Sequence, residues 1–393
     1  MFKIKLNLLT KILIAIVLGI LLGSMMPMWA ARGFATFKSL FSQFLGFIIP
    51  LIILSMVASS IGGLGRNAGR MLLLTVGVAY ASTIFSGYFT YGICDTLLPN
   101  LLSGEAMAQA PENSEVFAPY FTLSIPPAMS VITALVLAFV VGIGLIYVQN
   151  NTLKCAVDDF AEIITRVISS VIIPCLPLYI FTIFMEMAAS NYISVVMGLF
   201  TKVIIVIIVM HVVILLLLFS IAGIITHRNP LSILKTMLPA YMTALGTSSS
   251  AATIPVTLQQ TIKNGVSSST AGMVVPLCAT IHMPGSVMKV VSCSMAIMIL
   301  TGGTYDISLY TAFIFMLAFT AIAAPGVPGG MIMASLGVLQ SVLGFDQTAC
   351  GLMIAVYVAL DSFGTACNVT GDGAIALVVD KYARKKENIV VEN

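Results

Sequence analysis

The chain has 393 residues, of which 59% are hydrophobic and only 8% are charged, and its formal net charge is +3. This composition excludes an ordinary soluble globular domain and predicts a polytopic α-helical membrane protein. The small positive charge gives no reason to expect a nucleic-acid partner. The seven cysteines form no CxxC pair, so neither a disulfide framework nor a metal site is indicated.

Long apolar runs predict helical spans in the first part of the chain. They cover residues 8–28, 40–61, 71–98, 126–148, 160–188 and 195–225. Basic residues such as Lys5, Arg66 and Lys381 lie at ends that share one side, whereas the loop between the third and fourth spans is acidic. The positive-inside rule therefore predicts that both termini are cytoplasmic. Arg32 and Lys38, in the expected loop after the first span, go against this pattern.

Two later segments are too irregular for simple crossings. Segment 230–265 contains LGTSSSAATIP, where hydroxyls that bind local backbone and the missing N–H of Pro255 both favour a break. Segment 308–344 contains AIAAPGVPGGM, whose prolines and glycines forbid a continuous helix. Each segment predicts a hairpin that enters and leaves on one side of the membrane, with its tip buried among other polar groups.

Each predicted hairpin precedes a further span. An irregular span at 268–300, with CATIHMPGS at its centre, follows the first hairpin, and the last span at 346–381 follows the second. The first hairpin comes after an even number of spans and the second after an odd number, so they enter from opposite faces. Paired interrupted segments in two inverted halves predict a transporter site near the middle of the bilayer.

The last span carries a polar stripe. Asp361, Thr365, Asn368 and Asp372 follow one another at i, i+4, i+7 and i+11, so they project from one face of a helix. Acidic groups at membrane depth normally face a protein interior or a wet cavity and bind something. The alternative is a buried network of polar groups that satisfy one another. The broken segments upstream favour a binding site.

The segments SSSAATIPVT, CATIHMPGS, AAPGVPGG and ALDSFGTACNVTGD resemble, in order and spacing, those of the dicarboxylate/amino acid:cation symporters, the glutamate and neutral amino acid transporter family. The resemblance implies an all-α membrane protein with eight transmembrane helices and two re-entrant hairpins, arranged as inverted repeats in an elevator-type transporter. It also implies a homotrimer in the bacterial inner membrane, without enzymatic activity or a cofactor. Residues 1–65 and 120–192 would form the scaffold, and residues 66–119 and 193–393 the moving transport part.

The resemblance assigns the substrate's amino group to Asp361, a role that suits a buried anion. The other implied substrate positions are Thr365, Asn368, Ser249, Ser250, Ser286, Gly326, Val327 and Gly364. Family members that take acidic substrates usually carry an arginine where this chain has Gly364. Without that cation a second substrate carboxylate would remain unpaired in a dry pocket, so we expect a small neutral amino acid such as serine, threonine or alanine.

Three other functions are compatible with parts of this pattern. An acidic amino acid or dicarboxylate symporter is the first, and a channel whose hairpins form a filter is the second. An intramembrane aspartyl enzyme is the third, but Asp361 and Asp372 would lie about 16 Å apart along one helix, too far to share a proton.

The resemblance also implies sites for coupling cations. The side chains of Asp372 and Asn368, with carbonyls of Cys278 and His282, would bind one sodium ion. Carbonyls at Thr280, Ala321, Ile322 and Ala324 would bind a second. A third site is expected to be lost, because the family's NMD triplet is replaced by His282, Met283 and Pro284, and no matching ligand set is found in the third span. Fewer sodium ions per cycle, or protons instead, are therefore predicted.

His282 and Lys289 are seven residues apart, hence on one helix face. An imidazole would carry a proton during the cycle, and a tethered ammonium would stand in for a missing cation. The alternative is a neutral His282 bonded to a carbonyl and a Lys289 that extends to an interface.

Overall fold

A computed structural model describes residues 8–63, 70–102, 117–189, 193–324 and 329–391. These residues fold into helices, and no strand occurs among them. The elements are α1 Leu8–Gly23, α2 Met28–Gly63, α3 Arg70–Leu102, α4 Val131–Tyr147, α5 Thr152–Val167, the π-helix η1 Ile168–Ile172, α6 Ile173–Ala189, α7 Ile193–Thr226, α8 Pro230–Thr247, α9 Ser250–Lys263, α10 Ser268–Ile281, α11 Pro284–Leu300, α12 Ile307–Ala323, α13 Gly330–Leu343, α14 Gln347–Ala359 and α15 Asp361–Val391.

Several helices are suited to a bilayer. Within the described ranges five are long and apolar enough to cross a membrane, and the bent pair α14 and α15 makes a sixth if it counts as one span. The five cover Met28–Gly63, Met71–Leu102, Thr152–Ala189, Phe200–Thr226 and Ser268–Leu300. The prediction of an all-helical, polytopic membrane protein is confirmed at this level.

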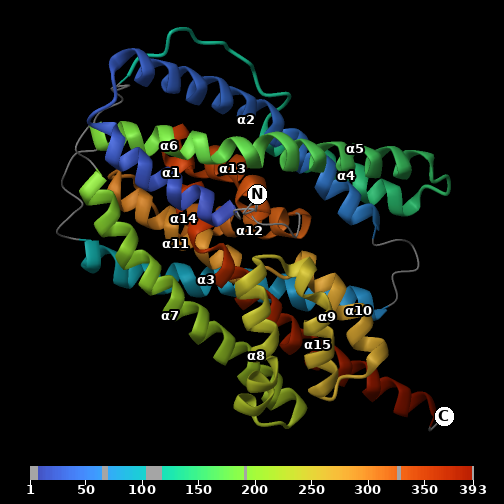
Figure 1. The fold of residues 1–393 in the computed structure, drawn as a ribbon. Coiled ribbons are helices and arrows are strands. Elements are labelled where there is room, and N and C mark those ends of the chain that lie inside the picture. The colour runs from blue at the N-terminus through green and yellow to red at the C-terminus, as the bar shows by residue number, and fades with distance from the viewer. Residues whose placement is uncertain (1–7, 64–69, 103–116, 190–192, 325–328, 392–393) are drawn as a thin grey trace, which may run out of the picture.

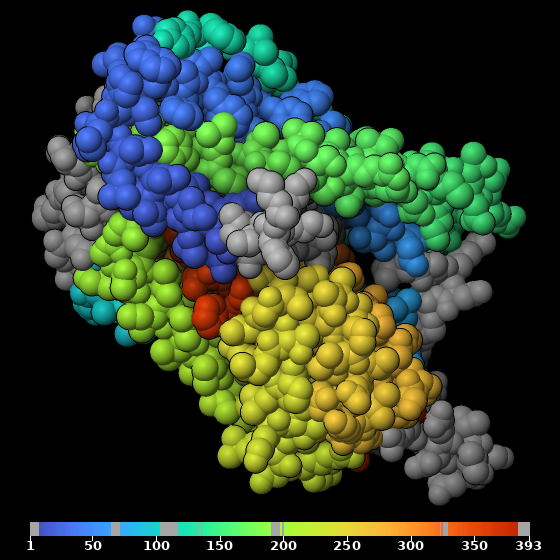
Figure 2. Space-filling view, in the orientation of Figure 1, coloured from blue at the N-terminus to red at the C-terminus, as the bar shows by residue number. Residues whose placement is uncertain are grey.

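The helix with the polar stripe lies deep in the structure. Helix α15 packs against α7, α8, α9, α10 and α11, whereas α1 packs along α6 and α2 along α4 in the upper part of Figure 1. Figure 2 shows α8 and α9, in yellow to gold, forming the front of the lower part and hiding most of the red C-terminal chain. The polar face of α15 therefore meets other helices rather than the surroundings of the protein.

The second helix begins earlier than the apolar pattern predicts. Helix α2 starts at Met28, so Arg32 and Lys38 lie within a helix, and their placement in a loop is wrong. The Arg32 guanidinium lies 4.6 Å from the centre of the Tyr120 ring, and Lys38 forms an ion pair with Glu186. Both charges therefore have partners inside the protein, which the hydropathy pattern does not reveal.

Two helices joined by a short turn occupy the first predicted hairpin. Asn229 caps α8, and its side chain accepts hydrogen bonds from the backbone of the first turn. Ser248 adopts a left-handed conformation with φ of 51°, and the Ser249 hydroxyl then caps α9. The predicted break within LGTSSSAATIP is therefore confirmed at Ser248 and Ser249, whereas Pro255 lies inside α9 and does not cause it. The serine caps end and restart the helix before the proline is reached.

The second predicted hairpin contains α12 and α13. Its described part ends at Ala324 and resumes at Gly329, so Gly326 and Val327 lie outside the described residues. Gly329 has a φ of 75°, a conformation that favours glycine. The first residues of α13, Gly330 and Met331, are buried, and the N-cap Gly329 has no side chain to cap the helix.

Two spans are broken near the centre of the structure. Helix α10 ends at Ile281 and α11 begins at Pro284, because proline lacks an N–H and disfavours helical geometry at the residue before it, Met283. The second break falls at Leu360, where α14 and α15 meet at a bend of 62°. No glycine or proline marks that position, so the local sequence does not predict the bend.

Candidate functional site

The helix is interrupted at Leu360, and α15 begins with Asp361 directly after this interruption. The Asp361 side chain is buried. Oδ1 accepts a hydrogen bond of 3.1 Å from the Lys289 ammonium, and Oδ2 accepts one of 2.8 Å from the backbone N–H of Gly329. A carboxylate at a helix N-terminus is further stabilised by the helix dipole. Asp361 thus joins α11, α13 and α15.

Lys289 is fully buried and does not extend to an interface. Its Nζ lies 3.6 Å from the centre of the Tyr357 ring and 3.5 Å from the carbonyl oxygen of Leu360. It also fills the space above Gly364, where an added Cβ would lie 2.4 Å from Cε and 2.6 Å from Nζ. The turn of α15 that carries Gly364 has no cation of its own, but α11 places the Lys289 ammonium beside it, in keeping with the expectation that Lys289 stands in for a missing cation.

Ser286 and Asn368 form a second polar layer next to this pair. The Ser286 hydroxyl accepts hydrogen bonds of 3.0 Å from the Tyr357 hydroxyl and from the Asn368 amide. The Asn368 amide oxygen in turn accepts from the backbone N–H of Gly285 at 2.8 Å. The first turn of α11, freed by the break before Pro284, is thereby bound to the middle of α15.

The first hairpin reaches the same helix start. The hydroxyls of Ser248 and Ser362 are hydrogen-bonded at 2.8 Å, so the turn between α8 and α9 contacts the residue that follows Asp361. Ser250 is buried and Ser249 is half-buried at this turn. Thr365 is buried on α15. Both hairpin segments therefore converge on the first turn of α15.

The other acidic end of the stripe has different partners. The Asp372 carboxylate is hydrogen-bonded to Nδ1 of His282 at 2.9 Å, and Nε2 of His282 lies 3.0 Å from the Ser82 hydroxyl of α3. All three side chains are buried. His282 bonds to side chains rather than to a carbonyl, and its imidazole faces the carboxylate that was expected to bind sodium.

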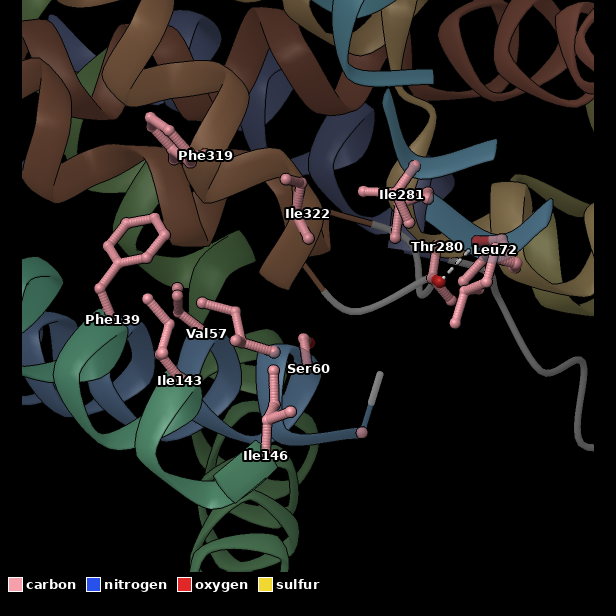
Figure 3. A pocket seen from close by; sticks show the side chains of 14 residues that line it. Val57, Ser60, Leu72, Phe139, Ile143, Ile146, Thr280, Ile281, Phe319 and Ile322 are labelled. Atoms are coloured by element: carbon pink, nitrogen blue, oxygen red, sulfur yellow. Dashed lines mark hydrogen bonds between the residues drawn. The ribbon is translucent and has the colours of Figure 1, made fainter. Parts of the chain in front are cut away.

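The other predicted sodium ligands are mostly backbone carbonyls, and they are spread over α10 and α12. In the described residues, no group of three or more His, Cys, Asp or Glu side chains is arranged to hold a metal ion, so a sodium site would depend on carbonyl and amide oxygens as well. The carbonyl of Cys278 accepts the N–H of His282, and that of Ala321 accepts the N–H of Ala324. Thr280 and Ile322 line an apolar cavity of about 540 Å³ between α2, α3, α4, α10 and α12 (Figure 3).

Several side chains at the site were not among the predicted site residues, including Tyr357, His211 and Ser82. Tyr357 lies one turn before Asp361, a spacing that could have indicated it. His211, on α7, hydrogen-bonds the carbonyl of Gly285 through Nε2 at 3.0 Å, and an isolated histidine in an apolar run is only a weak signal. Ser82 carries no signal, because nothing in its local sequence predicts that α3 passes His282.

Comparison of the sequence with known proteins identifies the family to which the chain belongs. The chain matches the sequence model of the Sodium:dicarboxylate symporter family over residues 8–382. The chain belongs to this symporter family. A serine/threonine transporter SstT of Acinetobacter baumannii (strain AYE) is 28% identical over 404 residues, covering 98% of this chain and 99% of the relative. A serine/threonine transporter SstT of Acinetobacter baylyi is 26% identical over 406 residues, with 98% and 100% covered.

Membership of the sodium:dicarboxylate symporter family confirms the resemblance drawn from the four segments. The protein is a membrane transporter that couples solute movement to a cation gradient. The polar groups that converge on α15 include two buried acidic side chains, Asp361 and Asp372, and buried charges within an apolar bundle normally bind a substrate or an ion.

Proposed function

We propose that the protein is a sodium-coupled symporter of a small neutral amino acid, with serine and threonine as the first candidates. The observation that carries this proposal is the charge balance at Asp361. Its carboxylate lies beside one ammonium, that of Lys289. In the described residues of this cluster no second cation is available for an acidic side chain. The names of the full-length relatives point to the same substrates.

The proposed binding mode follows from the chemistry of a zwitterion. Its ammonium would bind Asp361 through a charge-assisted hydrogen bond. Its carboxylate would bind the helix starts at Ser249 and Ser250 and at the hairpin tip that includes Gly326 and Val327, because free N–H groups and the helix dipole favour an anion there. Thr365, Asn368 and Ser286 would then contact the substrate's side-chain hydroxyl. Gly364 would leave the space that Lys289 fills.

For the coupling ion we propose sodium at Asp372 and Asn368, with carbonyls of Cys278 and His282. The second sodium would bind carbonyls of Thr280, Ala321, Ile322 and Ala324. The hydrogen bond between His282 and Asp372 supports a further arrangement, in which His282 carries a proton and reduces the number of sodium ions per cycle. Uptake in a sodium-only gradient and in a proton-only gradient separates the two arrangements.

We further propose the architecture that the family resemblance implies. It comprises eight spans and two re-entrant hairpins with inverted repeats, in a homotrimer of the bacterial inner membrane with both termini cytoplasmic. Residues 1–65 and 120–192 would form the scaffold, and residues 66–119 and 193–393 would move as an elevator. The packing of α1 along α6 and of α2 along α4, apart from the helices around α15, supports this division.

A second candidate is the symport of an acidic amino acid or dicarboxylate. The position of Lys289 favours it, because its ammonium fills the space above Gly364 and would meet a substrate carboxylate if it left Asp361. Nothing comparable favours a channel, which has less need of a carboxylate matched to an ammonium.

Counterflow in proteoliposomes tests the proposal. Vesicles loaded with unlabelled amino acid accumulate labelled serine only if the protein exchanges it, and a panel of serine, threonine, alanine, aspartate, glutamate and succinate reports specificity. We expect serine or threonine to exchange fastest and net uptake to require sodium outside. Faster exchange of aspartate or succinate than of serine would establish the second candidate, and conduction without saturation would indicate a channel.

A further inference from the structure

In this structure Asp361 has a partner at each oxygen. Lys289 donates to Oδ1 at 3.1 Å and the Gly329 N–H donates to Oδ2 at 2.8 Å. Asp361 is only 5% exposed. A substrate ammonium would therefore have to displace a resident partner before it could bind there.

The two resident partners are not equivalent. The N–H of Gly329 belongs to the backbone and carries no charge, so it cannot compensate a carboxylate. Lys289 carries a full charge on a flexible four-carbon stem, and its primary ammonium is the same chemical group that an amino acid substrate presents. It is held by Asp361, by the face of the Tyr357 ring and by the carbonyl of Leu360, three groups that suit a cation.

We propose that Lys289 occupies the position of the substrate's ammonium on Asp361 when the pocket is empty, and that an incoming amino acid displaces it. The inference rests on the proposed function, since it needs a substrate with an ammonium group. A zwitterion inserted into this ion pair keeps Asp361 compensated through its ammonium. Its carboxylate, bound by the helix starts at the hairpin tips, also offsets the charge of the displaced Lys289, which is not needed to hold the substrate. The buried carboxylate is then compensated in the loaded and in the empty carrier, and the empty carrier can return without an uncompensated charge at membrane depth.

Gly364 provides an independent way to test this pairing. A Cβ at position 364 would lie 2.4 Å from Cε of Lys289. Gly364→Ala would therefore displace the Lys289 ammonium from its position beside Asp361 without removing its charge. Gly373→Ala is the matched control on the same helix. Its Cβ would meet only the flexible end of Met237, at 2.7 Å, and Met237 has no part in the cluster around Asp361.

The test compares two rates in the same proteoliposomes. Serine exchange at saturating serine requires movement of the loaded carrier alone, whereas net sodium-driven uptake also requires return of the empty carrier. For Lys289→Met we expect the ratio of net uptake to exchange to fall by at least about tenfold, because each 1.4 kcal/mol of added cost in the empty carrier is a factor of ten. Gly364→Ala should lower the ratio in the same direction, and Gly373→Ala should leave it at the wild-type value.

Each outcome decides a distinct question. An unchanged ratio in folded Lys289→Met overturns the inference. Folded Lys289→Met that exchanges no serine even at saturation also overturns it, because Lys289 would then be essential to the loaded carrier. If Lys289→Met does not fold, the ratio for Gly364→Ala relative to Gly373→Ala decides alone. Wild-type protein that exchanges no amino acid would instead refute the proposed function.

Discussion

Asp361 and Asp372 lie on one face of one helix, about three turns apart, and both are buried, but their surroundings differ. Asp361 begins α15 beside a lysine ammonium and a backbone N–H. Asp372 lies within α15 beside an imidazole and, through it, a serine hydroxyl. The first carboxylate is compensated by a full charge on a mobile stem, the second by a group that is neutral or charged according to its protonation.

This difference indicates two tasks for one polar stripe. A carboxylate paired with a primary ammonium is matched to the ammonium of a substrate, because the two cations can exchange. A carboxylate next to an imidazole is matched to a sodium ion or a proton. The variants below test whether the two ends of the stripe are separable, from the largest expected effect to the smallest.

Asp361→Asn should cause the largest loss. It leaves the buried Lys289 ammonium without its counterion, and breaking such a pair costs about 3–5 kcal/mol. We expect serine exchange in proteoliposomes to fall more than about a hundredfold, since 1.4 kcal/mol corresponds to a factor of ten. Asp380→Asn is the control, because Asp380 is also buried on α15 but accepts hydrogen bonds from the backbone N–H and the hydroxyl of Ser267, away from the cluster at Asp361. Exchange by Asp361→Asn within a few-fold of the control would remove Asp361 from the substrate site.

Asp372→Asn should affect the cation more than the amino acid. The amide keeps the size of the carboxylate but removes the charge that would attract sodium. We expect the sodium concentration for half-maximal uptake to rise about tenfold, equivalent to about 1.4 kcal/mol, while exchange at saturating sodium persists. If Asp372→Asn and Asp361→Asn lose exchange equally at every sodium concentration, the separation of the two ends fails.

Tyr357→Phe should have a smaller effect at the Asp361 end. It removes the hydroxyl that donates to Ser286 but keeps the ring next to Lys289, and Ser286 still accepts from Asn368. One hydrogen bond of this kind contributes about 0.5–1.5 kcal/mol, so the KM for serine should rise by about two- to tenfold with an unchanged sodium dependence. Tyr357→Leu, which also removes the ring, should cost more. Equal KM values for the two variants would show that the ring contributes nothing.

Ser82→Ala should have the smallest effect, and only at the Asp372 end. It removes the hydroxyl 3.0 Å from Nε2 of His282, which weakens the orientation of the imidazole by about 1 kcal/mol. We expect a few-fold shift in the sodium dependence and no change in the KM for serine. Ser86→Ala is the control, since its buried hydroxyl bonds the carbonyl of Ser82 within the same helix. A larger shift in the control than in Ser82→Ala would exclude this role.

The sequence allowed a good prediction where the signal is local. The apolar runs predict the helical membrane class, and the segment CATIHMPGS predicts the irregular centre of the span at 268–300, where α10 ends and α11 begins. The i, i+4, i+7 and i+11 spacing places the stripe on one buried face of α15. The roles of the stripe and of the hairpin tips in binding stay predictions that the experiments above address.

The parts that were missed depend on contacts between distant segments. The bend at Leu360 has no glycine or proline to mark it, and it is this bend that makes Asp361 a helix start. The cation above Gly364 comes from Lys289 on another helix, so inspection of one turn of α15 could not find it. Arg32 and Lys38 were assigned to a loop because their partners, Tyr120 and Glu186, are far away in the chain.

The most direct test of the central claim is a cryo-electron microscopy structure of the protein in sodium with saturating serine. We predict serine in the cluster on α15, its ammonium bonded to Asp361 and Lys289 moved away from that carboxylate. Serine bound elsewhere, with the Lys289–Asp361 ion pair intact, would contradict the account.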